Sequence, residues 1–318
     1  MTLMKKNLTS KDFACFLGIS DNMLPTYCLR AISERNFRYE IISGKEREAV
    51  FLRVLKALDS LLDVAGPHRK QRWEDGWLEN LREFIASGYD INHLVPKFVK
   101  KAEVIRLDGE YIMPEDAEFE TNFVTILRLW LFSHWFSDVQ DIYEFGCGTA
   151  HNLVALAHLF PQKELFGLDW AKATLEIIRV LREELQYKIS GRLFDLVHPD
   201  HSFSLQPASG VFTIGTLEQI GKDFKPFIGY LIENRPHVCI HIETIYELYN
   251  PDILFDYIAV RYLEKRGYLQ GLLTYLRELE SAGNIEILAL QRTFGSLFHD
   301  GYSYVIWRPL DEKQRGVL

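Results

Sequence analysis

Cysteine is scarce in this chain, and its positions exclude the structures that cysteines usually build. The four cysteines lie far apart in the 318 residues and form no Cys-x-x-Cys pair. Structural zinc sites and the disulfide frameworks of small secreted domains need closely spaced cysteines, so neither is predicted. Cys147 lies in a glycine turn and Cys239 in an apolar segment, where we expect reduced thiols.

Long apolar runs and an excess of positive charge are also missing. No apolar stretch reaches the roughly 20 residues of a membrane-spanning helix, and the N-terminus lacks the apolar segment of a signal peptide. The formal net charge of −8 gives no overall attraction to nucleic acid or anionic lipid. We therefore expect a cytoplasmic protein without a nucleic-acid partner, although basic clusters at 68–72 and 97–106 leave a local patch open.

Residues 1–137 are predicted to form a mainly helical N-terminal domain. Apolar residues recur at helical spacing over residues 46–64 and 73–86, and residues 115–136 form a strongly apolar helical segment. Residues 104–112 surround an Asp-Gly pair, which is typical of a β-hairpin. We expect this domain to act as a cap or substrate domain.

From residue 141 onward, strand and helix patterns alternate regularly, which predicts an α/β fold with a largely parallel sheet. We assign residues 138–318 to this second domain. Seven segments are predicted as strands, around Tyr143 and at 165–169, 192–196, 211–215, 237–244, 285–290 and 302–307. Helices are predicted at 152–160, 171–187, 252–265 and 269–282, with another beginning near Thr216.

The stretch 140–170 carries the strongest indication of a ligand site. Gly146 and Gly148 follow a predicted strand and precede a helix, Glu144 stands just before them, and Asp169 ends the next strand. Glycines let a backbone approach a ligand closely, and the N–H groups that open a helix point at it. An acid at the end of the second strand is where a ribose diol is held. The pattern indicates a nucleoside-binding unit.

Spacing separates this unit from other nucleotide motifs. A dinucleotide fingerprint needs a third glycine where this chain has His151, and a P-loop needs Gly-Lys-Ser/Thr, which is absent. Glu-Phe-Gly-Cys-Gly-Thr at 144–149 instead resembles the first motif of class I S-adenosylmethionine-dependent methyltransferases, which often have glycine where this chain has Ala150. Residues 144–153, 167–171 and 217–221 also resemble bacterial methyltransferases of surface-glycan pathways.

The methyltransferase resemblance covers about residues 138–309 and implies fold, cofactor and site. It implies a seven-stranded Rossmann-like sheet with an antiparallel last strand and helices on both faces. S-adenosyl-L-methionine is the implied cofactor and S-adenosyl-L-homocysteine the product. The glycine turn would accommodate the methionine part, Asp169 the ribose and Asp195 the adenine. The cofactor-binding residues expected on this basis are Glu144, Gly146, Cys147, Gly148, Asn152, Asp169, Trp170 and Asp195.

Several of these assignments have alternatives. Trp170 either stacks on the adenine or belongs to the core. His151 and Asn152 either contact the cofactor carboxylate or cap the helix that they begin.

Candidates for the chemistry follow the fourth and fifth strands. Glu218 occupies the position that faces the reacting methyl group in this family, although an acid at a helix start is also favoured by the helix dipole. His241 and Glu243 share one side of an otherwise apolar strand, where unpaired burial is costly, so they form either a functional or a structural pair. The predicted catalytic residues are Glu218, His241 and Glu243, and the predicted substrate-binding residues are Tyr246, Arg292, His299 and Tyr302. Their spacing is not that of metal ligands, and we predict no metal.

The predicted function is methyl transfer to oxygen or nitrogen of a small acceptor, and a sugar or nucleotide sugar is one candidate. A homodimer is possible on the sequence evidence. Two alternatives remain. In the first alternative, the chain binds the cofactor without catalysis, as a regulatory or scaffold protein. In the second, it methylates protein or RNA. The surface expected for the macromolecular alternative combines Arg69, Lys70, Arg72, Lys97, Lys100 and Lys101.

Overall fold

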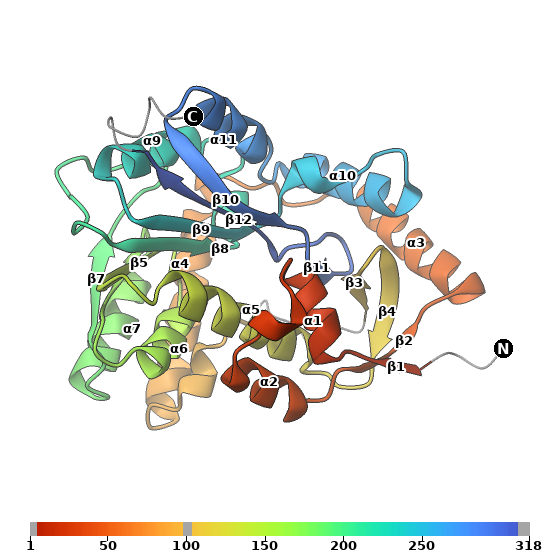
Figure 1. The fold of residues 1–318 in the computed structure, drawn as a ribbon, viewed down its shortest axis with the longest axis horizontal. Coiled ribbons are helices and arrows are strands. Elements are labelled where there is room, and N and C mark those ends of the chain that lie inside the picture. The colour runs from red at the N-terminus through yellow and green to blue at the C-terminus, as the bar shows by residue number, and fades with distance from the viewer. Residues whose placement is uncertain (1–4, 98–103, 311–318) are drawn as a thin grey trace.

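A seven-stranded mixed sheet dominates the second half of the chain (Figure 1). The computed structural model describes residues 5–97 and 104–310. The strand order is β10-β12-β9-β8-β5-β6-β7, and β12 runs in the opposite direction to the other six strands. This confirms the predicted α/β class with its antiparallel last strand. The bounds are β5 Asp141–Phe145, β6 Glu164–Asp169, β7 Ile189–Leu193, β8 Gly210–Ile214, β9 Val238–Glu243, β10 Ile285–Gln291 and β12 Ser303–Pro309.

Helices cover both faces of this sheet because its central strands are apolar on both sides. Along β9, for example, Ile240 packs into the core under one face and Cys239 into the core under the other. The first face is covered by α5 Phe119–Trp135, α6 His151–Leu159 and α7 Lys172–Glu183, and the second by α9 Lys225–Asn234 and α11 Leu272–Ser281. The short α8 Leu217–Ile220 follows β8, and α10 Leu254–Arg266 follows β9.

The strand order reverses next to β5. The chain passes from β5 outward to β6 and β7 and then returns to β8 on the other side of β5. At such a switch point the neighbouring connections leave for opposite faces, which opens a crevice beyond the carboxyl ends of the strands. Ligands of open α/β sheets bind in this crevice.

A second sheet joins the N-terminal part of the chain to the C-terminal part. Its order is β1-β2-β4-β3-β11, with bounds β1 Lys5–Asn7, β2 Arg38–Ile41, β3 Ile105–Leu107, β4 Glu110–Pro114 and β11 Phe294–Ser296. The predicted hairpin is confirmed, because β3 and β4 pair around Asp108 and Gly109, whose φ values of 50° and 74° suit a type I′ turn. The short β11, which sequence reasoning missed, pairs with β3.

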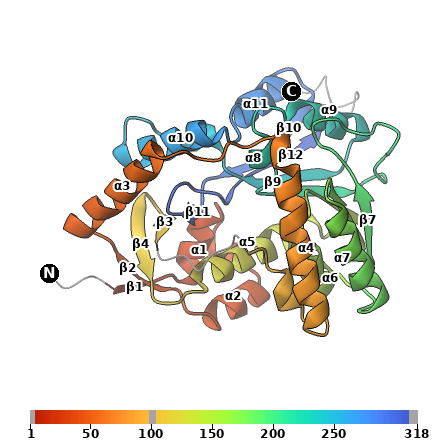
Figure 2. The same cartoon turned by 180° about the vertical axis from the view of Figure 1, so that it is seen from behind.

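Helices of the N-terminal part contribute to the core under one face of the large sheet, except α3, which packs beside α10. Their bounds are α1 Ser10–Phe16, α2 Thr26–Ser33, α3 Gly44–Asp59 and α4 Lys70–Ala86, in addition to α5. Helix α4 runs beside α7 (Figure 2), and Glu74 accepts hydrogen bonds from Lys172 N at 2.7 Å and Ala173 N at 3.1 Å. The division at residue 137 stays a prediction, since β11 and a common core link the two parts.

The third strand of the large sheet begins earlier than predicted. Residues 192–196 were expected, whereas β7 spans Ile189–Leu193 and pairs in parallel with β6. Phe194 and Leu196 are buried in the core on the α9 face, so their apolar character reflects packing after the chain has left the sheet. Asp195 therefore lies in the loop that follows β7. None of the helices in the described ranges is long and apolar enough to cross a bilayer.

Candidate functional site

A cavity of about 820 Å³ lies at the switch point of the large sheet. Its wall combines the glycine turn after β5 with residues of α4, α5, α8 and the loop between β11 and β12. The volume falls within the range of about 300–1,000 Å³ that small-molecule sites occupy.

The glycine turn forms one wall of this cavity. Gly146 and Gly148 have positive φ values of 72° and 52°. A Cβ atom at Gly146 would lie 2.1 Å from Thr216 Cγ2, and one at Gly148 would lie 2.9 Å from the ring of Trp77. Both positions therefore require glycine for backbone conformation and for packing. Ala150 adopts the left-handed conformation as well, with φ of 58°.

Asp169 connects the end of β6 to the glycine turn. Its carboxylate accepts hydrogen bonds from Gly148 N and Ala171 N, both at 2.9 Å. The side chain is buried, which raises its pKa to about 6 although these N–H groups pull the pKa down. Asp169 and the adjacent Trp170 both line the cavity.

Glu144 lies behind the turn and is incompletely paired. Oε1 accepts a hydrogen bond from Asn152 Nδ2 at 2.7 Å, whereas the buried Oε2 has no partner. Burial raises the pKa of Glu144 to about 8, against the effects of Asn152 and Arg128. Glu144 does not itself line the cavity, but Asn152 does. Glu144 therefore orients Asn152 toward the cavity.

Arg128 of α5 is a cavity residue that sequence reasoning missed. Its Nη1 lies 2.8 Å from Asn152 Oδ1 and 3.2 Å from His151 Nδ1, and Nε has no hydrogen-bond partner. Burial lowers the pKa of Arg128 to about 10. An arginine is costly to bury in an apolar helix, so its presence in this segment was a sequence signal that could have identified it.

Glu218 and His299 meet on another part of the cavity wall. Glu218 Oε2 lies 3.5 Å from His299 Nε2, and the side chain of each is 15% exposed. Gln219 Nε2 donates to Glu218 Oε1 at 2.8 Å, whereas His299 Nδ1 has no hydrogen-bond partner. The ring of Tyr262 is stacked 5.7 Å from that of His299. A carboxylate next to an imidazole is an arrangement suited to proton transfer.

The other predicted substrate-binding residues are distributed differently. Tyr302 lines the cavity and donates to Glu120 Oε1 at 2.8 Å. Tyr246 lies outside the cavity wall and donates to Glu264 Oε1 at 3.0 Å. Arg292 also lies outside it and is held by two aspartates, as described below.

Asp195 is paired with a lysine from the N-terminal part. Lys70 Nζ lies 2.7 Å from Asp195 Oδ2 and 5.1 Å from the ring centre of Trp170. Burial acts to raise the pKa of Asp195, but Lys70 and the N–H group of Val197 hold it below its usual value. Contact of Asp195 with an adenine stays a prediction.

His241 and Glu243 do not line the cavity. His241 is fully buried among Phe227 and Trp307, and burial lowers its pKa to about 3. Glu243 accepts hydrogen bonds from the N–H groups of residues 216, 217 and 218 at 3.0 to 3.2 Å. Glu243 thus positions α8, and with it Glu218, and neither His241 nor Glu243 contacts the cavity space.

The basic surface considered for a macromolecular acceptor is largely neutralised in the described residues. Arg69 is buried and lies 3.0 Å from Asp63, which also pairs with Arg72 at 2.7 Å. Lys70 is bound to Asp195, and Lys97 pairs with Glu79 and Glu83. Lys100 and Lys101 lie outside the described residues.

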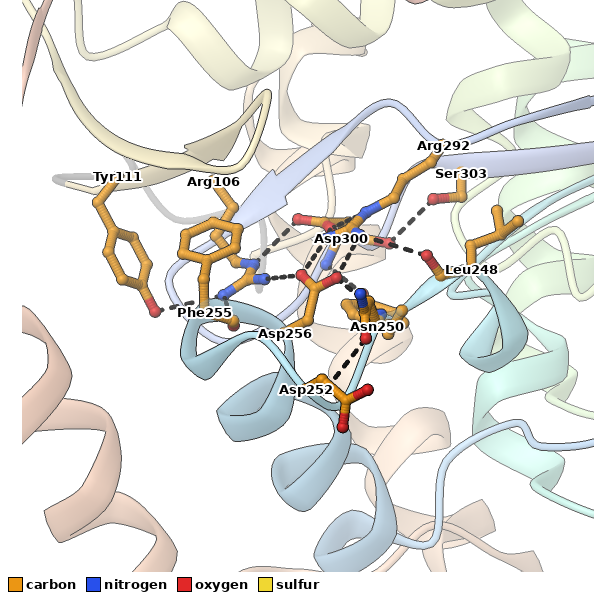
Figure 3. A network of polar contacts seen from close by, with 11 residues as sticks. Arg106, Tyr111, Leu248, Asn250, Asp252, Phe255, Asp256, Arg292, Asp300 and Ser303 are labelled. Carbon is orange, nitrogen blue, oxygen red and sulfur yellow. Dashed lines mark hydrogen bonds and ion pairs between the residues drawn. The ribbon is translucent and has the colours of Figure 1, made fainter.

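A buried ion network supports the loop that carries His299 (Figure 3). Arg106 of β3 donates to Asp300 Oδ1 at 3.0 Å and to the carbonyl oxygen of Phe255 at 3.0 Å. Arg292 donates to Asp300 Oδ2 at 2.7 Å and to both oxygens of Asp256, at 2.7 and 2.6 Å. Two cations and two anions therefore balance, and they connect β3, α10 and the residue next to His299.

The raised carboxyl pKa values predict how stability depends on pH. Burial also raises the pKa of Glu243 to about 8, with Glu218 adding to the shift. Unfolded glutamate titrates near 4.3, so between about pH 6.5 and 8 the folded chain keeps protons that the unfolded chain has released. The buried His151 and His241, whose pKa values are about 3, oppose this effect, because unfolded histidine titrates near 6.5. In the unfolded chain these two histidines together hold about one proton at pH 6.5 and almost none at pH 8, fewer than the protons that Glu144 and Glu243 keep in the folded chain. The free energy of unfolding should therefore fall as pH rises from 6.5 to 8.

Urea unfolding at several pH values tests this expectation. Each raised carboxyl contributes a slope of at most about 1.4 kcal/mol per pH unit. Glu144→Gln removes one contribution, so the decline with pH should become shallower. An unchanged or steeper decline in this variant would contradict the raised pKa of Glu144.

Within the described residues, no group of three or more His, Cys, Asp or Glu side chains is arranged to bind a metal ion. No protein-family model matches the chain, and no curated protein matches it.

The chain resembles several solved structures at low sequence identity. The chain resembles the cyclase SpnF with 14% identity, covering 78% of this chain and 98% of that one, at a TM-score of 0.49. It resembles magnesium protoporphyrin IX methyltransferase from Synechocystis PCC 6803 with bound SAH at 15% identity, covering 60% of this chain and 84% of that one, with a TM-score of 0.42. It resembles geranyl diphosphate C-methyltransferase from Streptomyces coelicolor A3(2) at 11% identity, covering 62% of this chain and 86% of that one, with a TM-score of 0.44. These likenesses are too distant to assign a function, and they lend no support to a surface-glycan type.

Proposed function

We propose that this chain binds S-adenosylmethionine and transfers its methyl group to an oxygen or nitrogen of a small acceptor. The observation that carries this proposal is the cavity at the switch point, which is bounded by the glycine turn and by Asp169 at the end of β6. This is the position at which open α/β sheets bind nucleosides.

The residues around the turn fit such a cofactor. Asp169 lines the cavity, where its carboxylate would accept hydrogen bonds from a ribose diol in addition to those from the turn, and Gly146 and Gly148 leave room for close approach. Arg128 is a buried cation whose hydrogen-bond partners, His151 and Asn152, are neutral, so it would attract the carboxylate of the methionine part. Trp170 would provide an aromatic surface for the adenine, which requires displacement of Lys70.

Glu218 and His299 would serve the acceptor. When bound, S-adenosylmethionine supplies an electrophilic methyl group on a positively charged sulfur. A hydroxyl acceptor placed beside His299, which lines the cavity, would lose its proton to the imidazole. Glu218 would stabilise the resulting imidazolium across the 3.5 Å contact. His241 and Glu243 receive no direct role, because neither reaches the cavity.

The finer predictions belong to the same proposal. We retain a cytoplasmic bacterial enzyme, a sugar-sized acceptor and a homodimer as working expectations. Cofactor binding without catalysis is the main alternative, and the Glu218 variant discussed below separates it from an enzyme.

Calorimetric titration with S-adenosylmethionine and S-adenosylhomocysteine tests the cofactor site. We expect Asp169→Asn to weaken both by about tenfold to a hundredfold, because charge-assisted hydrogen bonds are lost. Asp138→Asn, an exposed change outside the cavity, is the matched control and should leave affinity unchanged. Circular dichroism must show that both variants fold, since Asp169 also holds the turn. A folded wild-type protein that binds neither compound would refute the proposal.

A further inference from the structure

One end of the cavity carries arginines and aromatic rings that the cofactor proposal does not use. Arg69, Arg266, Tyr262, Tyr268 and Phe298 line the cavity together with Glu218 and His299. They come from three segments that are distant in sequence: the start of α4, the end of α10, and the loop between β11 and β12.

This end is built by tight contacts between its segments. Ala65 N donates to the carbonyl oxygen of Arg266 at 2.7 Å, which fixes the chain before α4 against the end of α10. A Cβ atom at Gly221 would lie 2.6 Å from the carbonyl oxygen of Gly267, so the end of α8 packs directly on the same corner. The arginines are therefore held close to Glu218.

The two arginines leave positive charge at the cavity wall. Arg69 is 6% exposed and shares Asp63 with Arg72, so one acid faces two cations. Arg266 donates to the hydroxyl of Tyr268 at 2.8 Å and lies 4.8 Å from its ring centre, and its buried Nε has no hydrogen-bond partner. No carboxylate within the described residues forms an ion pair with Arg266. Burial lowers the pKa of Arg69, and the nearby Arg266 also acts to lower it.

A buried arginine, Arg69, next to the partly exposed Arg266 is unfavourable unless an anion lies close to both. Guanidinium groups bind carboxylates and phosphates with particular strength, because they offer several N–H donors in one plane. The adjacent rings of Tyr262 and Phe298, stacked at 4.5 Å, together with Tyr268 provide an apolar surface for a ring.

We propose that this end of the cavity, named here the Arg69–Arg266 pocket, binds an acceptor in which a ring carries a carboxylate or phosphate group. The anionic group lies between Arg69 and Arg266, the ring lies against the tyrosines, and the reacting hydroxyl faces His299. This inference rests on the proposed methyl transfer for the identity of the reaction, but the anion preference is a binding property that is measurable without it.

Matched pairs of probes test the preference by calorimetry, with and without S-adenosylhomocysteine. The pairs are para-hydroxybenzoate and its methyl ester, phenyl phosphate and phenol, and glucuronate and glucose. The first two pairs compare charged with uncharged aromatic compounds, with a carboxylate and a phosphate as the anionic group. The third pair compares a charged with an uncharged sugar. We expect the anion of at least one pair to bind tenfold or more tightly than its neutral counterpart.

Variants connect this preference to the pocket. Arg266→Gln and Arg69→Gln should each reduce anion binding about tenfold or more and leave binding of the neutral compound and of S-adenosylhomocysteine unchanged. Arg261→Gln, an exposed arginine of the same helix that pairs with Glu264, is the control and should change nothing. Two arginine variants are used so that a folding defect in one does not decide the result.

The outcomes separate the two proposals. Failure to bind S-adenosylhomocysteine alone would count against the cofactor site and not against the pocket. Equal binding of charged and neutral probes, no binding of any anion, or a preference that survives in both arginine variants would overturn the inference.

Discussion

Glu218→Gln should lower the rate of methyl transfer to a hydroxyl acceptor by roughly 10²- to 10⁴-fold, the usual contribution of general acid–base catalysis. The amide retains the shape of Glu218 but cannot stabilise an imidazolium on His299, 3.5 Å away. Affinity for S-adenosylhomocysteine should stay unchanged, because Glu218 lies on a different part of the cavity wall from the glycine turn.

Transfer of labelled methyl groups to the hydroxyl compounds that bind the Arg69–Arg266 pocket provides the measurement. The chain offers a matched control in Glu233, which forms an exposed pair with His201 at 2.7 Å outside the cavity. Glu233→Gln should leave the rate unchanged. Full activity in Glu218→Gln would exclude the Glu218–His299 pair from proton removal, and absence of transfer by the wild-type protein to any bound hydroxyl would favour the non-catalytic alternative.

The second large effect concerns the stability of the ion network. Arg106→Met should lower the free energy of unfolding by about 3–5 kcal/mol, the usual cost of removing one partner of a buried ion pair. Arg106 is fully buried, and its loss leaves Asp300 and Asp256 with Arg292 as the remaining cation. It also removes the hydrogen bond to the carbonyl oxygen of Phe255.

Urea unfolding followed by circular dichroism measures this effect. Arg192→Met breaks an exposed arginine–aspartate pair, Arg192–Asp200 at 2.8 Å, and should cost far less because water solvates the separated charges. Adding Asp300→Asn to Arg106→Met should recover part of the loss, since it removes the excess negative charge beside Arg292. Equal destabilisation by Arg106→Met and Arg192→Met would show that burial does not strengthen the network.

The network also explains why the N-terminal part and the loop of His299 form one unit. Arg106 lies on β3, which pairs with β11, and Asp300 directly follows His299. The orientation of His299 toward Glu218 therefore depends on a strand that precedes the large sheet in the chain. An isolated fragment that begins at residue 138 would lack both β3 and Arg106.

The sequence by itself determined the α/β class, six of the seven predicted strand positions to within a few residues, the glycine turn and the position of Asp169. These features follow from local patterns, because side-chain alternation, turn residues and the ends of strands are encoded within short segments. The third strand was predicted too late in the chain, because the apolar residues Phe194 and Leu196 suggested a strand. Both residues instead pack in the core beyond the end of β7.

Only the tertiary structure decided which side chains share the cavity. Alternation along β9 places His241 and Glu243 on one side of the strand. Whether that side faces the cavity or the core is decided by the tertiary structure, in which His241 contacts Phe227 of α9 and Trp307 of β12. Arg69, Arg128 and Arg266 reach the cavity from segments far apart in the chain, and no local pattern encodes their meeting. Long-range packing brings these cations together with Glu218 and His299, and it therefore determines which chemistry the site can perform.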